Sequence, residues 1–136
     1  MRSDVEITTV GGCATDHVDP EKVAMVRSAA LGEPELAATA TLFKLLGDPT
    51  RTRLLYALLE AGELCVCDLA AATGVQEATA SHALRLLRMS GVVTARREGR
   101  LVFYRLADAH VRMLLDLTRE HVSHAGSATD SKKETA

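Results

Sequence analysis

Apolar residues recur at helical spacing in several segments of this 136-residue chain. Leu54, Leu55 and Leu58, for example, fall on one stripe of a helix. Helix-start signals precede three segments, because Asp19-Pro20, Asp48-Pro49 and Asp108 each supply an N-cap. The expected helices cover residues 20–31, 34–46, 49–61, 67–72, 76–89 and 109 to about 124.

The apolar period changes from 3.6 to 2 after residue 91. Residues 92–97 and 100–106 alternate around Glu98-Gly99, which predicts a β-hairpin. The two helices before it are separated only by the turn 73–75, the spacing of a helix-turn-helix. The predicted fold class is therefore mainly α with a β-hairpin wing, a winged helix-turn-helix.

Composition divides the chain into three parts. Residues 1–33 form an N-terminal arm with a short helix, residues 34–124 the winged helix-turn-helix and dimerisation domain, and residues 125–136 a disordered tail rich in Ser, Thr and Lys. No stretch reaches the roughly 18 apolar residues of a spanning helix, and the polar N-terminus is unlike a signal peptide. We therefore expect a cytoplasmic protein without a membrane partner.

Charge is distributed unevenly. The formal net charge is −2, yet residues 78–105 contain six arginines and one glutamate. One face is therefore basic, which favours a nucleic-acid partner. Aromatic residues make up only 3% of the chain and Trp is absent, which argues against a stacking surface for single strands. Double-stranded DNA is the expected partner.

A winged helix-turn-helix inserts its second helix into the major groove and lays its wing along phosphates or in the minor groove. We assign base contacts to the helix at 76–89 and phosphate contacts to the wing. A solvated basic face is the alternative, and for Arg85 alone both interpretations stay open. The candidate DNA-binding residues are Gln76, Thr79, Ser81, His82, Arg85, Arg96, Arg97 and Arg100.

The last predicted helix has metal-ligating residues at both ends. His110 and His121 differ by about 20° around the helix axis but lie about 16 Å apart along it, so one helix cannot close a site. Asp108 accompanies the first histidine and His124 the second. Two antiparallel copies would join the two ends, which predicts a homodimer with a tetrahedral site twice per dimer. The alternative is a surface helix with polar histidines.

The three cysteines suggest a second site. Cys65 and Cys67 project to one side whether the segment is extended or begins a helix. Cys13 and His17 in the arm could complete a set of three sulfurs and one nitrogen. Such a set suits Zn(II), Cd(II) or Pb(II) as inducer ligands. The alternatives are a buried small residue at Cys65 and an arm without a role.

Three motifs carry a family resemblance: Glu63-Leu64-Cys65-Val66-Cys67-Asp68-Leu69, then Ala80-Ser81-His82-Ala83-Leu84, then Asp108-Ala109-His110. Over residues 34–124 the chain resembles the ArsR/SmtB family of metal-sensing bacterial repressors. The resemblance implies a homodimer that represses its operator when metal-free and dissociates when metal binds. It also implies control of metal efflux, sequestration or resistance genes.

The resemblance also maps ligands onto this chain. The family's thiolate site corresponds to Cys65 and Cys67 with arm ligands Cys13 and His17, and its last-helix zinc site to Asp108, His110, His121 and His124. The cadmium/lead branch has two arm cysteines, so the histidine here moves the expected metal toward zinc. Arsenic-responsive members use a third cysteine where this chain has Ala70, which ranks arsenite lower.

Other function classes explain the sequence less well. A zinc hydrolase needs an open metal position and a general base, whereas both clusters supply four protein donors and no H-E-x-x-H motif occurs. We therefore expect no enzyme. A thiol-based redox regulator or an arsenite-responsive regulator stays the alternative. A redox regulator, however, does not explain why the histidines of the last helix share one face. Either metal site could be the regulatory one.

Overall fold

The computed structural model describes the backbone of residues 18–134 and the side chains of residues 18–126. Contacts divide the chain into two units, residues 1–38 and 39–136. The first unit contains α1 (Pro20–Ser28) and the start of α2 (Glu33–Leu46). Asp19 caps α1 as predicted, because its Oδ1 accepts from the backbone N–H of Lys22 at 3.0 Å. The helix ends before the predicted residue 31, and it has no buried residue whose packing would prolong it.

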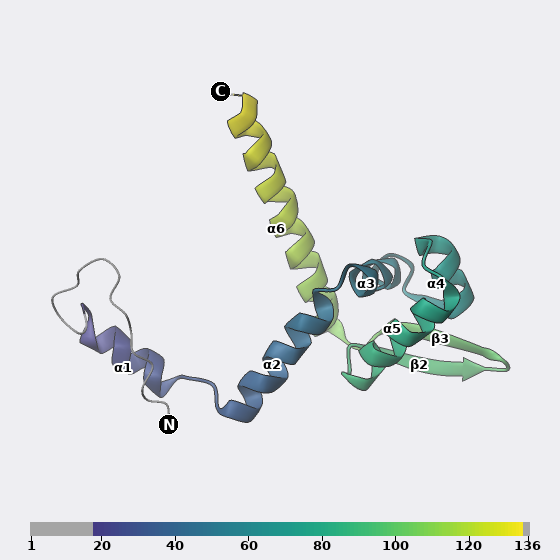
Figure 1. Ribbon diagram of the computed structural model, residues 1–136, viewed down its shortest axis with the longest axis horizontal. Helices are drawn as coiled ribbons and strands as arrows, with labels where there is room; N and C mark the ends of the chain where they lie inside the picture. The colour runs from purple at the N-terminus through teal and green to yellow at the C-terminus, as the bar shows by residue number, and fades with distance from the viewer. Residues whose placement is uncertain (1–17, 135–136) are drawn as a thin grey trace. The chain divides into compact units, whose positions relative to one another are not determined.

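The second unit is the winged helix-turn-helix (Figure 1). It continues from α2 into α3 (Pro49–Ala61), β1 (Glu63–Cys65), α4 (Val66–Thr73), α5 (Glu77–Met89), β2 (Val93–Glu98), β3 (Leu101–Leu106) and α6 (Ala109–Glu134). The three strands form an antiparallel sheet in the order β1-β3-β2. The predicted fold class, mainly α with a β-hairpin wing, is confirmed.

The core lies between α3, α4, α5 and the sheet. The stripe predicted on α3 is fully buried at Leu54, Leu55 and Leu58. The other core residues are Leu69, Ala80, Ala83, Leu84, Leu87, Val92, Val93, Tyr104, Leu106 and Leu115. Tyr104 is the only aromatic residue in this set, so the core is built mainly from aliphatic side chains.

Local signals set the ends of these helices. Oδ2 of Asp48 accepts from the backbone N–H of Arg51 at 3.1 Å and caps α3. Gly74 ends α4 in the left-handed region, with φ at 74°, and separates the two helices of the helix-turn-helix. The structure therefore places α4 and α5 within one or two residues of the predicted bounds.

Two elements differ from the sequence-based prediction. Strand β1 was not expected, because a segment of three residues is too short to show the alternation that marks a strand. It is recognised only by its pairing with β3. Helix α6 runs to Glu134, whereas we expected it to end near residue 124 and to be followed by a disordered tail. Residues 125–134 contain as many weak helix formers (Gly, Ser, Thr and Asp) as strong ones (Ala, Lys and Glu), so their composition does not explain the longer helix. In the described part of the chain no helix is long and apolar enough to cross a membrane.

Candidate DNA interface and metal-binding half-sites

Helix α5 has one buried and one exposed face. Ala80, Ala83, Leu84 and Leu87 contact the core. The opposite face presents Thr79, His82 and Arg85, which are exposed and three residues apart, so they align along the helix. Gln76 is exposed at the N-cap and Ser81 is half-buried. Thr79, His82 and Arg85 therefore lie on one accessible side, as a major-groove helix requires.

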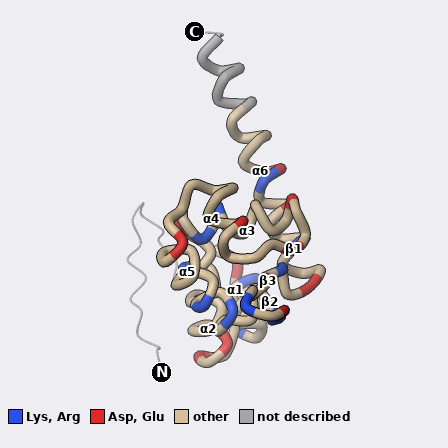
Figure 2. The backbone as a smooth tube through the Cα atoms, turned by 90° about the vertical axis from the view of Figure 1, so that its right-hand side faces the viewer, with Lys and Arg blue, Asp and Glu red and all other residues tan. Residues whose placement is uncertain are grey.

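The wing presents its arginines at and near the turn. Gly99, with φ at 62°, and Arg100 form a two-residue turn between the paired residues Glu98 and Leu101. Arg97 and Arg100 are both exposed. Figure 2 shows the Lys and Arg positions of the second unit along the tube, those of the wing among them. Free guanidinium groups at a wing tip suit contacts with phosphate oxygens.

Arg96 has other partners. Its Nη2 and Nε contact Oε1 of Glu63 at 2.7 Å and 3.0 Å, and its Nη1 contacts Oε2 of Glu98 at 2.7 Å. The guanidinium also lies 4.6 Å from the ring centre of Phe103. The hydrogen bond from Arg96 lowers the pKa of Glu63. Arg96, which we expected to contact phosphate, is thus held on the sheet by two carboxylates.

The two described cysteines lie where β1 meets α4. Cys65 is the last residue of β1 and the N-cap of α4, and its side chain is buried. Cys67 lies in the first turn of α4, and both are free thiols. The Sγ of Cys67 donates to Oε1 of Glu77, the first residue of α5, at 3.5 Å. This hydrogen bond and the charge of Glu77 raise the pKa of Cys67.

At the start of α6, Asp108 both caps the helix and lies beside His110, the other candidate metal ligand at this end. Oδ1 of Asp108 accepts from the backbone N–H of Val111 at 3.1 Å, and this bond lowers the pKa of Asp108. The same oxygen lies 3.6 Å from Nδ1 of His110. The structure thus brings Asp108 and His110 together, with both side chains exposed.

The other histidines lie further along α6. His121 and His124 are exposed, three residues apart, and therefore on one side of the helix. Nε2 of His124 lies 3.8 Å from Oε1 of Glu120. An oxygen-nitrogen pair at one end and a nitrogen pair at the other match the donors that Zn(II) accepts.

Each of these groups supplies two candidate donors. Among the residues that the structure describes, no three His, Cys, Asp or Glu side chains are grouped so that they could hold a metal ion. Two sulfur donors suit a soft metal but need further ligands. The expected arm ligands Cys13 and His17 lie outside the described residues. The donor types therefore fit a metal, and completion requires another segment or another chain.

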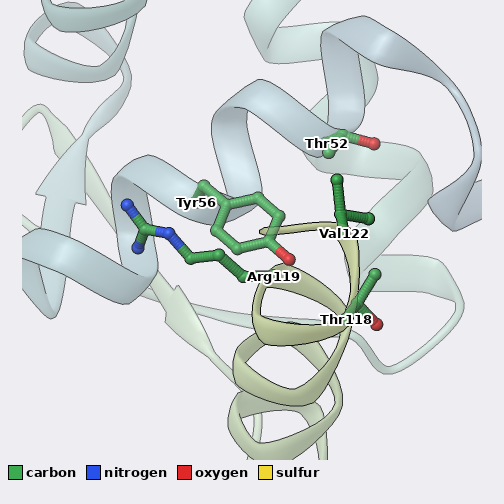
Figure 3. A pocket seen from close by; sticks show the side chains of 5 residues that line it. All are labelled: Thr52, Tyr56, Thr118, Arg119 and Val122. Carbon is green, nitrogen blue, oxygen red and sulfur yellow. The ribbon is translucent and has the colours of Figure 1, made fainter. Parts of the chain in front are cut away.

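A contact between α3 and α6 holds the helix that carries the histidines. Tyr56 donates from its Oη to the backbone carbonyl of Leu115 at 2.6 Å, and burial raises the pKa of Tyr56. The guanidinium of Arg119 lies 5.7 Å from the ring centre of Tyr56. Both side chains line an open cavity of about 350 Å³ together with Thr52, Thr118 and Val122. Figure 3 shows how these five side chains lie.

Sequence reasoning missed the carboxylates that contact candidate residues. Glu63 and Glu98 could not be assigned to Arg96, because that contact depends on β1 and on the strand register. Glu77 had a usable signal, since it begins the second helix of a helix-turn-helix whose first helix begins beside Cys67.

Comparisons with known proteins agree with this fold. A family model described as bacterial regulatory protein, arsR family, matches residues 48–95. The chain is 38% identical to the cadmium resistance transcriptional regulatory protein CadC homolog of Staphylococcus aureus, over 85% of this chain and 94% of that protein. It is 44% identical to the transcriptional repressor SmtB homolog of a Synechocystis strain, over 82% of each.

A solved structure is similar as well. It is the homodimeric winged helix-turn-helix DNA-binding domain of a possible ArsR-family transcriptional regulator from Mycobacterium bovis, which aligns with a TM-score of 0.60 at 32% identity. The match covers 81% of this chain and 95% of that one.

Proposed function

Because this chain belongs to the ArsR/SmtB family of winged helix-turn-helix transcriptional repressors, we propose that it binds operator DNA as a metal-free homodimer and leaves the DNA when Zn(II), Cd(II) or Pb(II) binds. The genes under its control would serve metal efflux or resistance. Members of this family are DNA-binding regulators, not enzymes. The word cadmium in the name of the staphylococcal relative supports a divalent metal as the inducer.

One observation supports this function above all others. The DNA-reading unit begins at the pair Cys65 and Cys67, and Cys67 hydrogen-bonds Glu77 at the start of α5. A metal must displace the thiol protons to bind here, since the thiolate is the ligand. Metal binding would therefore act on the contact between α4 and the helix that reads DNA.

The DNA contacts follow from exposure. Helix α5 would place Gln76, Thr79, Ser81, His82 and Arg85 against bases and nearby phosphates, with its buried face on the core. Arg97 and Arg100 would contact phosphates from the wing. Arg96 would contribute less, because its guanidinium is bound to Glu63 and Glu98.

The homodimer would complete the half-sites of α6. Asp108 and His110 of one protomer would meet His121 and His124 of the other if the two copies of α6 run antiparallel. Met113 and Leu117 are exposed on α6 by 59% and 61% and lie one helical turn apart, so they can pack against a second copy. The homodimeric relative of known structure supports this assembly.

The thiolate site would be completed by the arm. Residues 1–33 would bring Cys13 and His17 to Cys65 and Cys67, while residues 34–124 form the DNA-binding and dimerisation domain. A bound metal ion would supply the charge and the bonds that join these segments. Release then requires that the metal bind the dimer conformation of low DNA affinity more tightly than the DNA-bound conformation.

The test is a fluorescence-anisotropy titration of reduced, metal-free protein on DNA from upstream of its own gene. Zn(II), Cd(II), Pb(II) and arsenite are added separately at fixed salt, because salt alone changes such affinities strongly. We expect tight metal-free binding that a divalent metal reverses. Cys65→Ser and His121→Ala then identify the regulatory site, because the variant of the silent site still responds.

Other results would contradict the proposal. Binding that no metal reverses, but that oxidation abolishes, would establish a thiol-based redox regulator. Release by arsenite alone would establish the arsenite-responsive alternative. A chain that binds no DNA at all would remove the central claim.

A further inference from the structure

The register of the sheet connects Cys65, the first cysteine of the thiol pair, to the wing. Cys65 of β1 is opposite Phe103 of β3, and Phe103 is opposite Arg96 of β2. Directly opposed residues in an antiparallel sheet share a face, as do residues two apart on one strand. Glu63 therefore lies on the same face as Cys65, one row away.

Side-chain contacts join these rows across β3. Strands β1 and β2 do not pair with each other, because β3 lies between them. The guanidinium of Arg96 crosses this strand above the ring of Phe103 and contacts both carboxylate oxygens of Glu63 through Nε, each at 3.0 Å. The Glu63 side chain is 30% exposed, against 67% for Glu98, the other carboxylate on Arg96.

The two carboxylates on Arg96 differ in what they connect. Glu98 belongs to β2, the same strand as Arg96, so its contact stays within the wing. Glu63 belongs to β1, which has only three residues and ends at Cys65. A displacement of β1 at its last residue reaches β3 through the backbone pairing of the two strands, and it reaches Arg96 of β2 through Glu63 and not through Glu98.

We propose that the Glu63–Arg96 ion pair positions the wing relative to the Cys65/Cys67 pair. Metal binding at these thiols would then change the position of Arg97 and Arg100 relative to DNA. The inference rests on the proposed function and assigns Glu63 and Arg96 as positioning residues. A charge-paired, forked contact suits this role, because it fixes orientation as well as distance.

The experiment compares Glu63→Gln with Glu98→Gln in the full-length dimer. Each variant removes one carboxylate from Arg96 and changes the net charge equally, so non-specific attraction to DNA rises equally in both. Cd(II) is the probe, because its charge-transfer absorption with thiolates reports binding without DNA. DNA affinity is then measured with and without Cd(II), and the ratio of the two affinities is the coupling.

We expect both variants to bind Cd(II) with the stoichiometry and affinity of the unmodified protein. The coupling should fall by about fivefold or more in Glu63→Gln and stay near the original value in Glu98→Gln. Amide NMR signals of Gly99 and Arg100, recorded without DNA, should shift on Cd(II) addition in the unmodified protein and shift much less in Glu63→Gln. Arg96→Lys, which keeps the charge but loses the fork, should behave like Glu63→Gln.

Equal coupling in the two glutamine variants would overturn the inference, as would a lower melting temperature of Glu63→Gln with the coupling unchanged. If Cd(II) binds at the thiols of the unmodified protein and the Gly99 and Arg100 signals do not move, the inference also fails. If those signals move but DNA is not released, the inference stands and the proposed function fails.

Discussion

The thiol of Cys67 is tuned by one carboxylate from the neighbouring helix. Glu77 accepts its hydrogen bond and adds negative charge, and both effects raise the pKa of Cys67. The thiol therefore stays protonated at neutral pH, and its thiolate fraction grows only as pH rises. Glu77→Gln should lower this pKa and speed alkylation of Cys67 in the metal-free protein at pH 8, measured by iodoacetamide trapping and peptide mass spectrometry.

Glu98→Gln is the matched control, since it removes the same charge from the wing. It should leave the alkylation rate of Cys67 unchanged. The ratio of the alkylation rates of Glu77→Gln and the unmodified protein should fall toward one as pH rises above the Cys67 pKa of both proteins. Equal rates in all three proteins across this range would show that Glu77 does not control the thiol.

The wing arginines should separate into two kinds. Arg97 and Arg100 are exposed, whereas Arg96 is bound to Glu63 and Glu98. Arg97→Ala and Arg100→Ala should each weaken operator binding and reduce the slope of log affinity against log salt by about one. Arg96→Ala should reduce this slope less, although it disturbs the wing. Anisotropy titrations at several salt concentrations measure all three.

At the scale of the element, helix ends and the β2–β3 hairpin were predictable, whereas the pairing of β1 with β3 was not. Asp48 and Gly74 set helix ends through their own side chain or backbone, so the sequence locates α3, α4 and α5 closely. The strand that ends at Cys65 exists only because β3 pairs with it, and a long-range contact leaves no local signal. For the same reason the residue types of the site were predictable, while the contact of Glu63 with Arg96 was not.

Helix α5 owes its position to its buried face. Leu84 is fully buried and contacts the core, while its neighbour Arg85 is exposed. Leu84→Ala should reduce the free energy of unfolding by about 2–5 kcal/mol, because it leaves a cavity under the recognition helix. Arg85→Ala should change it by less than about 0.5 kcal/mol. Urea unfolding of the metal-free protein measures both, and a similar loss for the two variants would contradict this packing.

Substitution of Asp108 by Asn and by Ala can separate its role as a helix cap from its proposed role as a metal ligand. It caps α6 through the backbone N–H of Val111, and it lies beside His110 as a candidate ligand. Asn also caps helices but lacks the carboxylate charge. Asp108→Asn should therefore keep the melting temperature of the metal-free protein, whereas Asp108→Ala should lower it.

Both variants should weaken zinc binding at α6 by about tenfold or more, as removal of a ligand costs at least as much as removal of its support. Competition with a chromophoric chelator in a Cys65→Ser background measures this site by itself. Zinc affinity that is unchanged in Asp108→Asn would exclude Asp108 as a ligand.

At the scale of the whole molecule, the proposed α6 site links metal binding to the assembly of two chains. The α6 pairs lie at separate places on one helix, and within the described residues no cluster of three donors forms. In the proposed antiparallel dimer, the surface that joins the two copies would also assemble the ligands, so loss of the dimer should abolish the α6 site.

Leu117 offers a direct test of that link. It is 61% exposed on α6 between the two donor pairs, so it would be buried where two copies meet. Leu117→Glu would bury a charge there without a pairing group and should convert the protein to monomers, as measured by sedimentation equilibrium without DNA. The control is Leu101→Glu, the same change at an exposed wing position, and it should remain dimeric.

The monomer should lose zinc binding at α6 together with operator binding, whereas Leu101→Glu should lose affinity for DNA alone. Each donor pair would then be left with two ligands, too few for a tetrahedral ion. A monomeric Leu117→Glu that still binds zinc tightly in a Cys65→Ser background would show that one chain closes the site, and the antiparallel arrangement of α6 would be wrong. A dimeric Leu117→Glu would place the interface on another element.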